Sequence, residues 1–176
     1  MRSSFIKLLS LFLLTVSAPA VLAEWTVETY KNNDRGLAIK VAVNENDEGY
    51  KLEIYRDENG VVRSRFSTEN TSYRMNSQFC PTFDIEQRGM QNVSINGESC
   101  LADSKWAEFI LGYIIDEEVT STPLYNFMNG RKIIYRFILQ PHGYAETSFS
   151  LINSKRILLE ALGYNLTVRT DKGYTN

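Results

Sequence analysis

Apolar and polar residues alternate along much of the chain after residue 24, and a period of two is typical of strands that bury one face. In the N-terminal half this alternation predicts four strands, Trp25–Tyr30, Leu37–Val43, Tyr50–Arg56 and Val61–Ser67. Branched and aromatic residues, which favour strands, are frequent in all four. The polar run Asn44–Gly49 predicts a turn between the second strand and the third.

The third and fourth segments form a hairpin whose register follows from the length of its loop. A two-residue loop would place Arg56 opposite Arg63, and like charges in that position are unfavourable. A three-residue loop, with Gly60 at positive φ, avoids this. It pairs Glu53 with Arg65 and Tyr55 with Arg63 on one face, and it groups Leu52, Ile54 and Arg56 with Val62, Ser64 and Phe66 on the other.

The pattern weakens between Thr71 and Ser104, where only two short strands, Phe83–Ile85 and Val93–Ile95, are expected. The next segment, Trp106–Ile115, fits both helical and strand spacing. Its density of aromatic and branched residues, and the Gly112 within it, favour a buried strand, because an internal glycine costs a helix about 1 kcal/mol.

The C-terminal part mixes strands with two short helices. Pro123–Met128 predicts a helix that ends at Asn129-Gly130, and Asn153 is the expected N-cap of a second helix that ends at Gly163. Further strands are predicted over Lys132–Leu139, Tyr144–Leu151 and Tyr164–Arg169. The expected fold is therefore mostly β, either β-sandwich-like or α+β, with antiparallel strands and two short helices in the C-terminal half.

The first 23 residues have the order of a secretory signal peptide. Arg2 and Lys7 give a positive start, Phe5–Val16 is apolar, and small residues follow in Ala18–Ala23. The apolar core is shorter than the roughly 20 residues that a spanning helix needs. We therefore predict a signal peptide over residues 1–23, cleaved after Ala23 or alternatively after Ala20, and one β-rich domain over residues 24–176. No membrane span is expected after cleavage, and the compact leader indicates the periplasm or the exterior of a bacterial cell.

Composition and charge narrow the class of protein further. The chain has 176 residues, of which 43% are hydrophobic and 23% charged, so it is too apolar for a disordered chain. Its net charge of −2 offers no basic surface for nucleic acid, and none is expected as a partner. Both basic residues of the leader are lost on cleavage, so the mature domain is more acidic than the whole chain.

Candidates for catalysis or metal binding are few. The single histidine, His142, lies in a Pro-His-Gly turn, and no Gly-x-Ser-x-Gly motif surrounds any serine. One histidine and two distant cysteines do not have the spacing of a zinc site. The acidic run Asp116–Glu118 would serve glycoside hydrolysis only if a second acid faced it across a cleft. We assign no catalytic, cofactor-binding or metal-binding residue and expect no cofactor.

Cys80 and Cys100 are the only two cysteines. In an oxidising compartment two thiols usually pair, and their spacing is not that of a redox-active Cys-x-x-Cys motif. We therefore predict a structural disulfide. It would close a loop of about 21 residues and stabilise the fold by about 3 kcal/mol in the chain-entropy model.

The order of segments resembles the invasion-associated locus B family and related uncharacterised bacterial envelope proteins. The resemblance covers most of residues 25–165 and is carried by loosely spaced segments. In the first part of the chain these are the opening Trp25-Thr26-Val27, the two-hairpin region and the two-cysteine segment. In the second part they are Leu124–Gly130 with the strand Arg131–Arg136 after it, and Phe149–Leu151 before Ser154 and the Ala161-Leu162 helix. It implies a periplasmic or secreted β-rich accessory protein without an established catalytic mechanism.

Three functions are consistent with these observations. The first is an exported, non-enzymatic protein that binds a partner protein or an envelope component. The second is a periplasmic hydrolase that uses acidic residues or His142, and the third is a carrier with an aromatic pocket for a small molecule. A pocket that converges on His142 or on two facing acids would favour the hydrolase.

Overall fold

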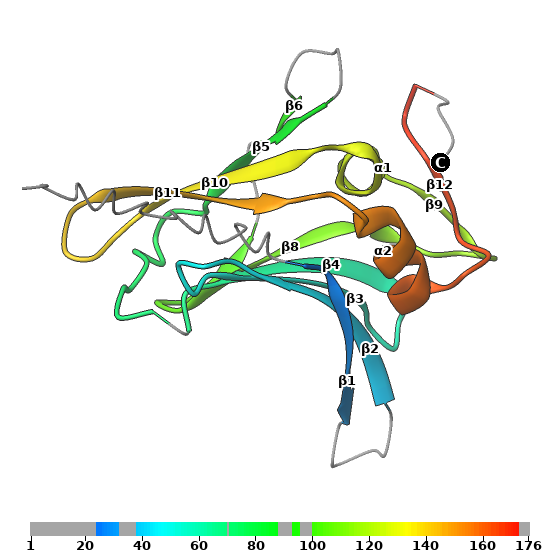
Figure 1. Cartoon of the computed structure of the whole chain (residues 1–176), viewed down its shortest axis with the longest axis horizontal. Helices are drawn as coiled ribbons and strands as arrows, with labels where there is room; N and C mark the ends of the chain where they lie inside the picture. Colours follow the sequence, from blue (N-terminus) through cyan, green and yellow to red (C-terminus); the bar gives the residue numbers. More distant parts are fainter. Residues whose placement is uncertain (1–23, 32–37, 70, 88–92, 96–99, 173–176) are drawn as a thin grey trace, which may run out of the picture.

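The computed structural model describes residues 24–31, 38–69, 71–87, 93–95 and 100–172. Two antiparallel sheets form the two layers of a sandwich-like, mostly β fold, and both described helices lie toward one end of it (Figure 1). The fold class predicted from the sequence is thus confirmed. The predicted signal peptide lies outside the described residues. None of the helices in the described ranges is long and apolar enough to cross a membrane.

The first layer is a six-stranded antiparallel sheet with the order β1-β2-β3-β4-β8-β7. Its strands are β1 (Thr26–Lys31), β2 (Ala38–Glu45), β3 (Lys51–Arg56), β4 (Val61–Ser67), β7 (Leu101–Ala102) and β8 (Trp106–Tyr113). Consecutive strands pair through β4, so this part of the sheet is a meander. The chain then leaves for the second layer before β7 and β8 return to its far edge.

The second layer is a four-stranded sheet with the order β11-β10-β5-β6. Its strands are β5 (Thr82–Glu86), β6 (Val93–Ile95), β10 (Lys132–Ile138) and β11 (Tyr144–Ser150). A small parallel pair, β9 (Glu118–Thr120) with β12 (Thr167–Arg169), stands beside the helices α1 (Thr122–Asn129) and α2 (Ser154–Leu162). The two-residue β7 and the three-residue β9 were not predicted.

Aromatic rings fill the space between the sheets. Phe66 of β4 stacks on Tyr135 of β10, with ring centroids 4.6 Å apart and an interplanar angle of 8°. Phe83 and Phe149 pack around the same pair. Tyr135 is fully buried, and its hydroxyl lies 3.4 Å from Ser64 Oγ. Such pairs add about 0.5–1.5 kcal/mol each beyond the burial of their surface, so this cluster is the centre of the core.

The β3–β4 hairpin has the predicted register. Glu53 lies opposite Arg65 and Tyr55 opposite Arg63. The loop has three residues, and Gly60 takes φ +81°, as the register required. Asp57 closes the loop: its Oδ1 accepts hydrogen bonds from the backbone N–H groups of Asn59 and Val61.

The segment Trp106–Ile115 is a strand over Trp106–Tyr113, as predicted, but it is not buried on both faces. Phe109 and Leu111 point into the core, whereas Ile110 is 53% exposed and Tyr113 is 58% exposed. One face of β8 thus belongs to the core and the other to solvent. The continuous apolar run had suggested burial on both.

Helix α2 starts directly after Asn153, so the predicted N-cap position is confirmed, but the Asn153 side chain does not cap the helix. Asn153 has φ +66° and its side chain makes no capping hydrogen bond. Helix α1, by contrast, is capped by the side chain of Ser121, whose Oγ accepts a hydrogen bond of 3.1 Å from the Leu124 N–H and donates one to the Leu111 carbonyl. The predicted end of α2 at Gly163 is confirmed, with φ +139°.

Side chains of the first layer close the free edge of β11. Trp25 Nε1 and Asn44 Nδ2 both donate to the Ser150 carbonyl, at 2.8 and 2.9 Å, and Asn46 Nδ2 donates to the Ser148 carbonyl at 3.1 Å. The backbone groups of successive strand residues point to alternate sides of the strand, and the N–H of Leu151 bonds toward β10. The carbonyls of Ser150 and Ser148 therefore lie on the side of β11 away from β10. Asn44 was expected in a turn; it lies instead within β2 and is fully buried.

The predicted disulfide between Cys80 and Cys100 is present. The two Cα atoms are 5.9 Å apart, inside the range that a disulfide spans. It ties the segment before β5 to the start of β7, and so it joins the two layers. Part of the loop that it closes lies outside the described residues.

Candidate functional site

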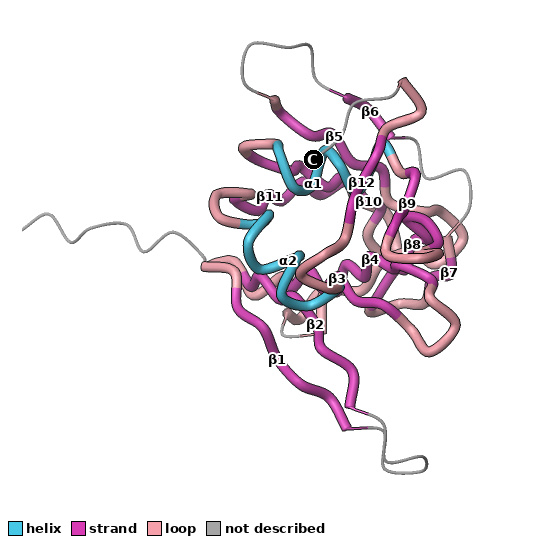
Figure 2. The backbone as a smooth tube through the Cα atoms, turned by 90° about the vertical axis from the view of Figure 1, so that its right-hand side faces the viewer, coloured by secondary structure: helices cyan, strands magenta, loops and turns pink. Residues whose placement is uncertain are grey.

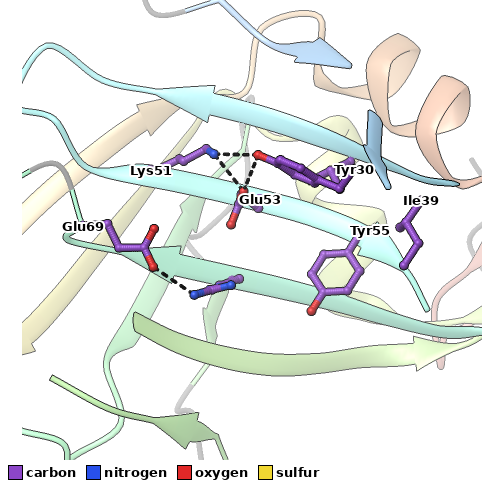
Figure 3. Close-up of a pocket in the computed structure, with 8 residues that line it drawn as sticks. Tyr30, Ile39, Lys51, Glu53, Tyr55 and Glu69 are labelled. Atoms are coloured by element: carbon purple, nitrogen blue, oxygen red, sulfur yellow. Dashed lines mark hydrogen bonds and ion pairs between the residues drawn. The ribbon is translucent and has the colours of Figure 1, made fainter. Parts of the chain in front are cut away.

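A shallow, solvent-open pocket of about 310 Å³ lies on the face of the six-stranded sheet that points away from the core. We call it the outer-face pocket. Figure 3 shows its lining, which comes from β1 to β4 and the residues just after β4: Tyr30, Ile39, Val41, Lys51, Glu53, Tyr55, Arg65 and Glu69. Strand alternation places these side chains outward, because their neighbours such as Leu52 and Phe66 fill the core.

Lys51 is the centre of one side of the pocket (Figure 3). Its ammonium lies 2.9 Å from Glu53 Oε1 and donates a hydrogen bond of 2.8 Å to the Tyr30 hydroxyl. The Tyr30 hydroxyl in turn donates to Glu28 Oε2 at 2.8 Å. Burial works against the charge on Lys51, but its hydrogen bonds to Tyr30 and Glu53 outweigh that effect and raise the pKa of Lys51. Burial raises the pKa of Tyr30 as well.

Tyr55 joins the pocket to a second network on the same face. Its hydroxyl donates a short hydrogen bond to Glu108 Oε2, and Glu108 Oε1 accepts a bond of 2.9 Å from Arg63. Arg63 also pairs with Asp57 Oδ2 at 2.9 Å. Burial, and then the adjacent Glu108 carboxylate, raise the pKa of Tyr55.

Arg65 lines the pocket from β4, across from Glu53 of β3. Its guanidinium lies 5.0 Å from the ring centroid of Trp106, and its terminal nitrogen pairs with Glu69 Oε1 at 3.0 Å. Arg65 Nε is buried and has no hydrogen-bond partner in the described part of the chain. Stacking on the indole therefore holds the guanidinium plane in place while part of its donor capacity is unused.

The surroundings on this face shift several pKa values. Wherever the environment clearly moves a pKa on this face, it moves it away from neutrality: those of Tyr30, Lys51 and Tyr55 are raised and that of Asp57 is lowered. A general acid or base works best with a pKa near the working pH. These groups instead keep fixed charges and fixed hydrogen bonds.

The residues considered from the sequence for catalysis do not meet in this pocket. His142 is exposed in the turn between β10 and β11. Asp116 and Glu117 form an exposed two-residue turn between β8 and β9, and both have positive φ, 49° and 63°. Within the described ranges, no group of three or more His, Cys, Asp or Glu side chains is placed to hold a metal ion.

A second open pocket, of about 270 Å³, does bring acidic residues together from distant segments. Asp47 and Glu48 of the β2–β3 turn line it with Glu146 of β11 and Lys132 of β10. Glu48 accepts a short hydrogen bond from Thr147 Oγ, and Glu146 pairs with Arg136 at 2.8 Å. The carboxylates of Glu48 and Glu146 are thus engaged by neighbouring side chains.

The sequence pointed to three of the eight residues that line the outer-face pocket. The predicted hairpin register placed Glu53, Tyr55 and Arg65 on one charged face, and that is where they lie. Tyr30 and Ile39 were missed because they reach this face through the pairing of β1 with β2, in the register Tyr30 opposite Ile39. Extending the hairpin argument across the Asn46–Gly49 turn would have placed β2 and its Ile39, but not Tyr30 of β1.

In comparisons with known proteins, no family model, no curated protein and no solved structure matches the chain. The resemblance to the invasion-associated locus B family stays a prediction. The geometry of the outer-face pocket is therefore the basis for assigning a function.

Proposed function

We propose that the protein is exported into the bacterial envelope and, without catalysing a reaction, binds a neutral glycan component of that envelope in the outer-face pocket. The observation that carries this proposal is the pairing of each charge in the pocket. Lys51 is paired with Glu53 and Arg65 with Glu69, so the pocket offers donors and acceptors side by side with little net charge.

A chain of sugar hydroxyl groups matches that arrangement. Each hydroxyl both donates and accepts a hydrogen bond, and bonds to charged partners are the stronger ones. The rings of Tyr30 and Tyr55 add apolar surface against which the C–H face of a sugar ring packs. A strongly anionic ligand would have to displace Glu53 and Glu69, and a cationic one Lys51 and Arg65.

The test uses mature protein beginning at Glu24 and a neutral probe, the trimer of N-acetylglucosamine, with heparin as the anionic comparison. Titration calorimetry should detect the neutral probe and little or no heparin binding. Tyr30→Ala should weaken binding about tenfold, the equivalent of roughly 1.4 kcal/mol. The matched control is Tyr164→Ala, since Tyr164 is also an exposed tyrosine but lies outside the pocket.

Three results would contradict the proposal. The first is binding of the neutral probe that Tyr30→Ala leaves intact, and the second is no binding of a broader panel of neutral envelope glycans. The third is release of shorter sugars by the wild-type protein but not by Glu48→Gln, which would favour the hydrolase and the acidic pocket. Export is tested separately: the intact mass of secreted protein should correspond to a chain that begins at Glu24 or Val21.

A further inference from the structure

Strand β1 leaves one edge of the six-stranded sheet open. It is the terminal strand of that sheet, and within the described residues its backbone pairs only with β2. Its six residues contain no proline, and their register with β2 continues without a bulge. From Glu28 to Lys31 every side chain is exposed, and Figure 2 shows β1 and β2 extending away from the rest of the molecule.

Two other edges of the described sheets are treated differently. Trp25, Asn44 and Asn46 occupy the edge carbonyls of β11, as described above. The opposite edge of the six-stranded sheet is β7, which has only two residues. Short edge strands and covered edges are common ways of preventing sheets from joining, and β1 has neither.

We propose that β1 pairs antiparallel with β1 of a second copy of this chain, about a two-fold axis through Thr29, so that the two six-stranded sheets become one. The inference stands independently of the ligand proposed for the outer-face pocket. A two-fold axis perpendicular to the sheet keeps the outer faces of both copies on the same side. Only registers in which one residue of the strand lies directly opposite its own copy satisfy that condition, and we call such a register centred on that residue.

Charge and burial select one of these registers. Centring on Glu28 would oppose two carboxylates, which is destabilising. Centring on Val27 would require Trp25 in the new pairing, but Trp25 is buried and bonded to Ser150. Centring on Tyr30 shortens the overlap toward the end of the strand. Centring on Thr29 opposes Thr29 with Thr29, Val27 with Lys31 and Glu28 with Tyr30, so no like charges meet.

The selected register also continues a network that is already present. The Tyr30 hydroxyl accepts a hydrogen bond from Lys51 and donates to Glu28 of its own chain. Pairing Glu28 with Tyr30 of the second copy places its carboxylate near that copy's Lys51, and the two-fold axis repeats the contact. Each cross-strand pair of this kind contributes about 0.2–1 kcal/mol. Because Tyr30 lines the outer-face pocket, the two pockets then lie next to each other.

The register is tested by cysteine cross-linking of the full mature chain. Directly opposed residues of an antiparallel pair have Cα atoms about 4.5–5.5 Å apart, within reach of a disulfide. Thr29→Cys should therefore form a covalent dimer under mild air oxidation. The matched control, Glu28→Cys, is equally exposed, but its two copies would be offset by two residues, roughly 6.6 Å along the strand, and should not cross-link.

The association itself is tested without a new cysteine. Sedimentation of the unmodified mature protein across a dilution series should show a reversible monomer–dimer equilibrium, and Glu28→Lys should raise its dissociation constant about tenfold, since it places like charges together. A monomer at every concentration overturns the proposal. Equal cross-linking of Thr29→Cys and Glu28→Cys overturns it as well, and peptide mapping confirms that the Cys80–Cys100 disulfide is intact in both variants.

Discussion

Replacing Gly130 with alanine tests how tightly the two layers and helix α1 pack. Gly130 ends α1 with φ −72°, a conformation that any residue adopts, so backbone freedom is not what requires glycine here. Lack of space is what requires glycine. A Cβ at this position would lie 2.6 Å from Ile85 Cγ2, 2.7 Å from Asn126 O and 2.9 Å from Leu151 Cδ1. Ordinary contacts to a Cβ are 3.4–4 Å. All three neighbours would have to move.

The size of the effect follows from that crowding. Ile85 and Leu151 belong to the buried core, so the added methyl group overpacks a filled region, at a cost of about 1–3 kcal/mol. Alanine also lowers the conformational entropy of the unfolded chain, and this offsets at most about 0.4–1 kcal/mol of that cost. For a domain of this size each kcal/mol corresponds to about 2–4 °C. We expect Gly130→Ala to lower the melting temperature by several degrees and to leave the shape of the circular-dichroism spectrum unchanged.

Gly143→Ala is the matched control, measured by thermal and urea unfolding. A Cβ at Gly143 meets nothing closer than Leu139 Cβ at 3.5 Å, an ordinary contact, so this variant should be as stable as the wild type or slightly more stable. Equal stability of Gly130→Ala and the wild type would refute the packing argument. A similar loss in both variants would show that the cost comes from the backbone and not from Ile85, Asn126 and Leu151.

Three further predictions concern charge, the disulfide and the turn histidine. Burial works to raise the pKa of Asp57, but the bond to Arg63 and the backbone donors outweigh burial and hold that pKa below the ordinary 3.8. The ionised Asp57 therefore stabilises the fold above pH 3.8, and this stabilisation is lost as the pH falls further. Asp57→Asn should therefore cost roughly 1 kcal/mol in urea unfolding at pH 7 and make stability less dependent on pH in the acid range, whereas an unchanged acid profile would contradict this. Replacing Cys80 and Cys100 with serine should cost about 3 kcal/mol, and equal stability of the wild type with and without reductant would contradict that. His142→Ala should leave glycan binding unchanged, and a folded variant that loses binding would show that the site lies elsewhere.

The β3–β4 hairpin was predictable because two independent constraints agree on its register. Leu52 and Phe66 require one apolar face, and the charges of Arg63 and Arg65 require opposite or neutral partners. A shift by one residue would expose the apolar set and break the charge pairing together. The order of strands around it was harder to predict, since β8 pairs with β4 across a long stretch of chain with little pattern.

Three errors of the sequence analysis have different physical causes. Asn44 looked like a turn residue because isolated asparagine favours turns; its buried place in β2 depends on the Ser150 carbonyl of another sheet. Asn153 has the right residue type for a cap, but its backbone is left-handed and not extended as in a typical N-cap, and its side chain makes no capping hydrogen bond. Strands as short as β7 and β9 contain too few residues to show any alternation.

The outer-face pocket was only partly predictable from the sequence. Its charged members on β3 and β4 belong to one hairpin, and a local argument reaches them. Tyr30 arrives from β1 through two successive pairings, and the loop between β1 and β2 offers no loop-length argument of the kind that worked for β3 and β4. A binding surface spread over several strands therefore requires every register between them.

The bond between Trp25 and the Ser150 carbonyl joins residues 125 positions apart, and this separation affects how the chain reaches its native state. Strands β1 to β4 pair with their nearest neighbours in sequence, so they can assemble as soon as they emerge in an N-to-C order. Their inner apolar face is not fully covered until β10 and β11, the last strands of the second layer, have also emerged. We therefore expect the half-built sheet to expose apolar surface that holding chaperones bind, and the edge of β11 to close last.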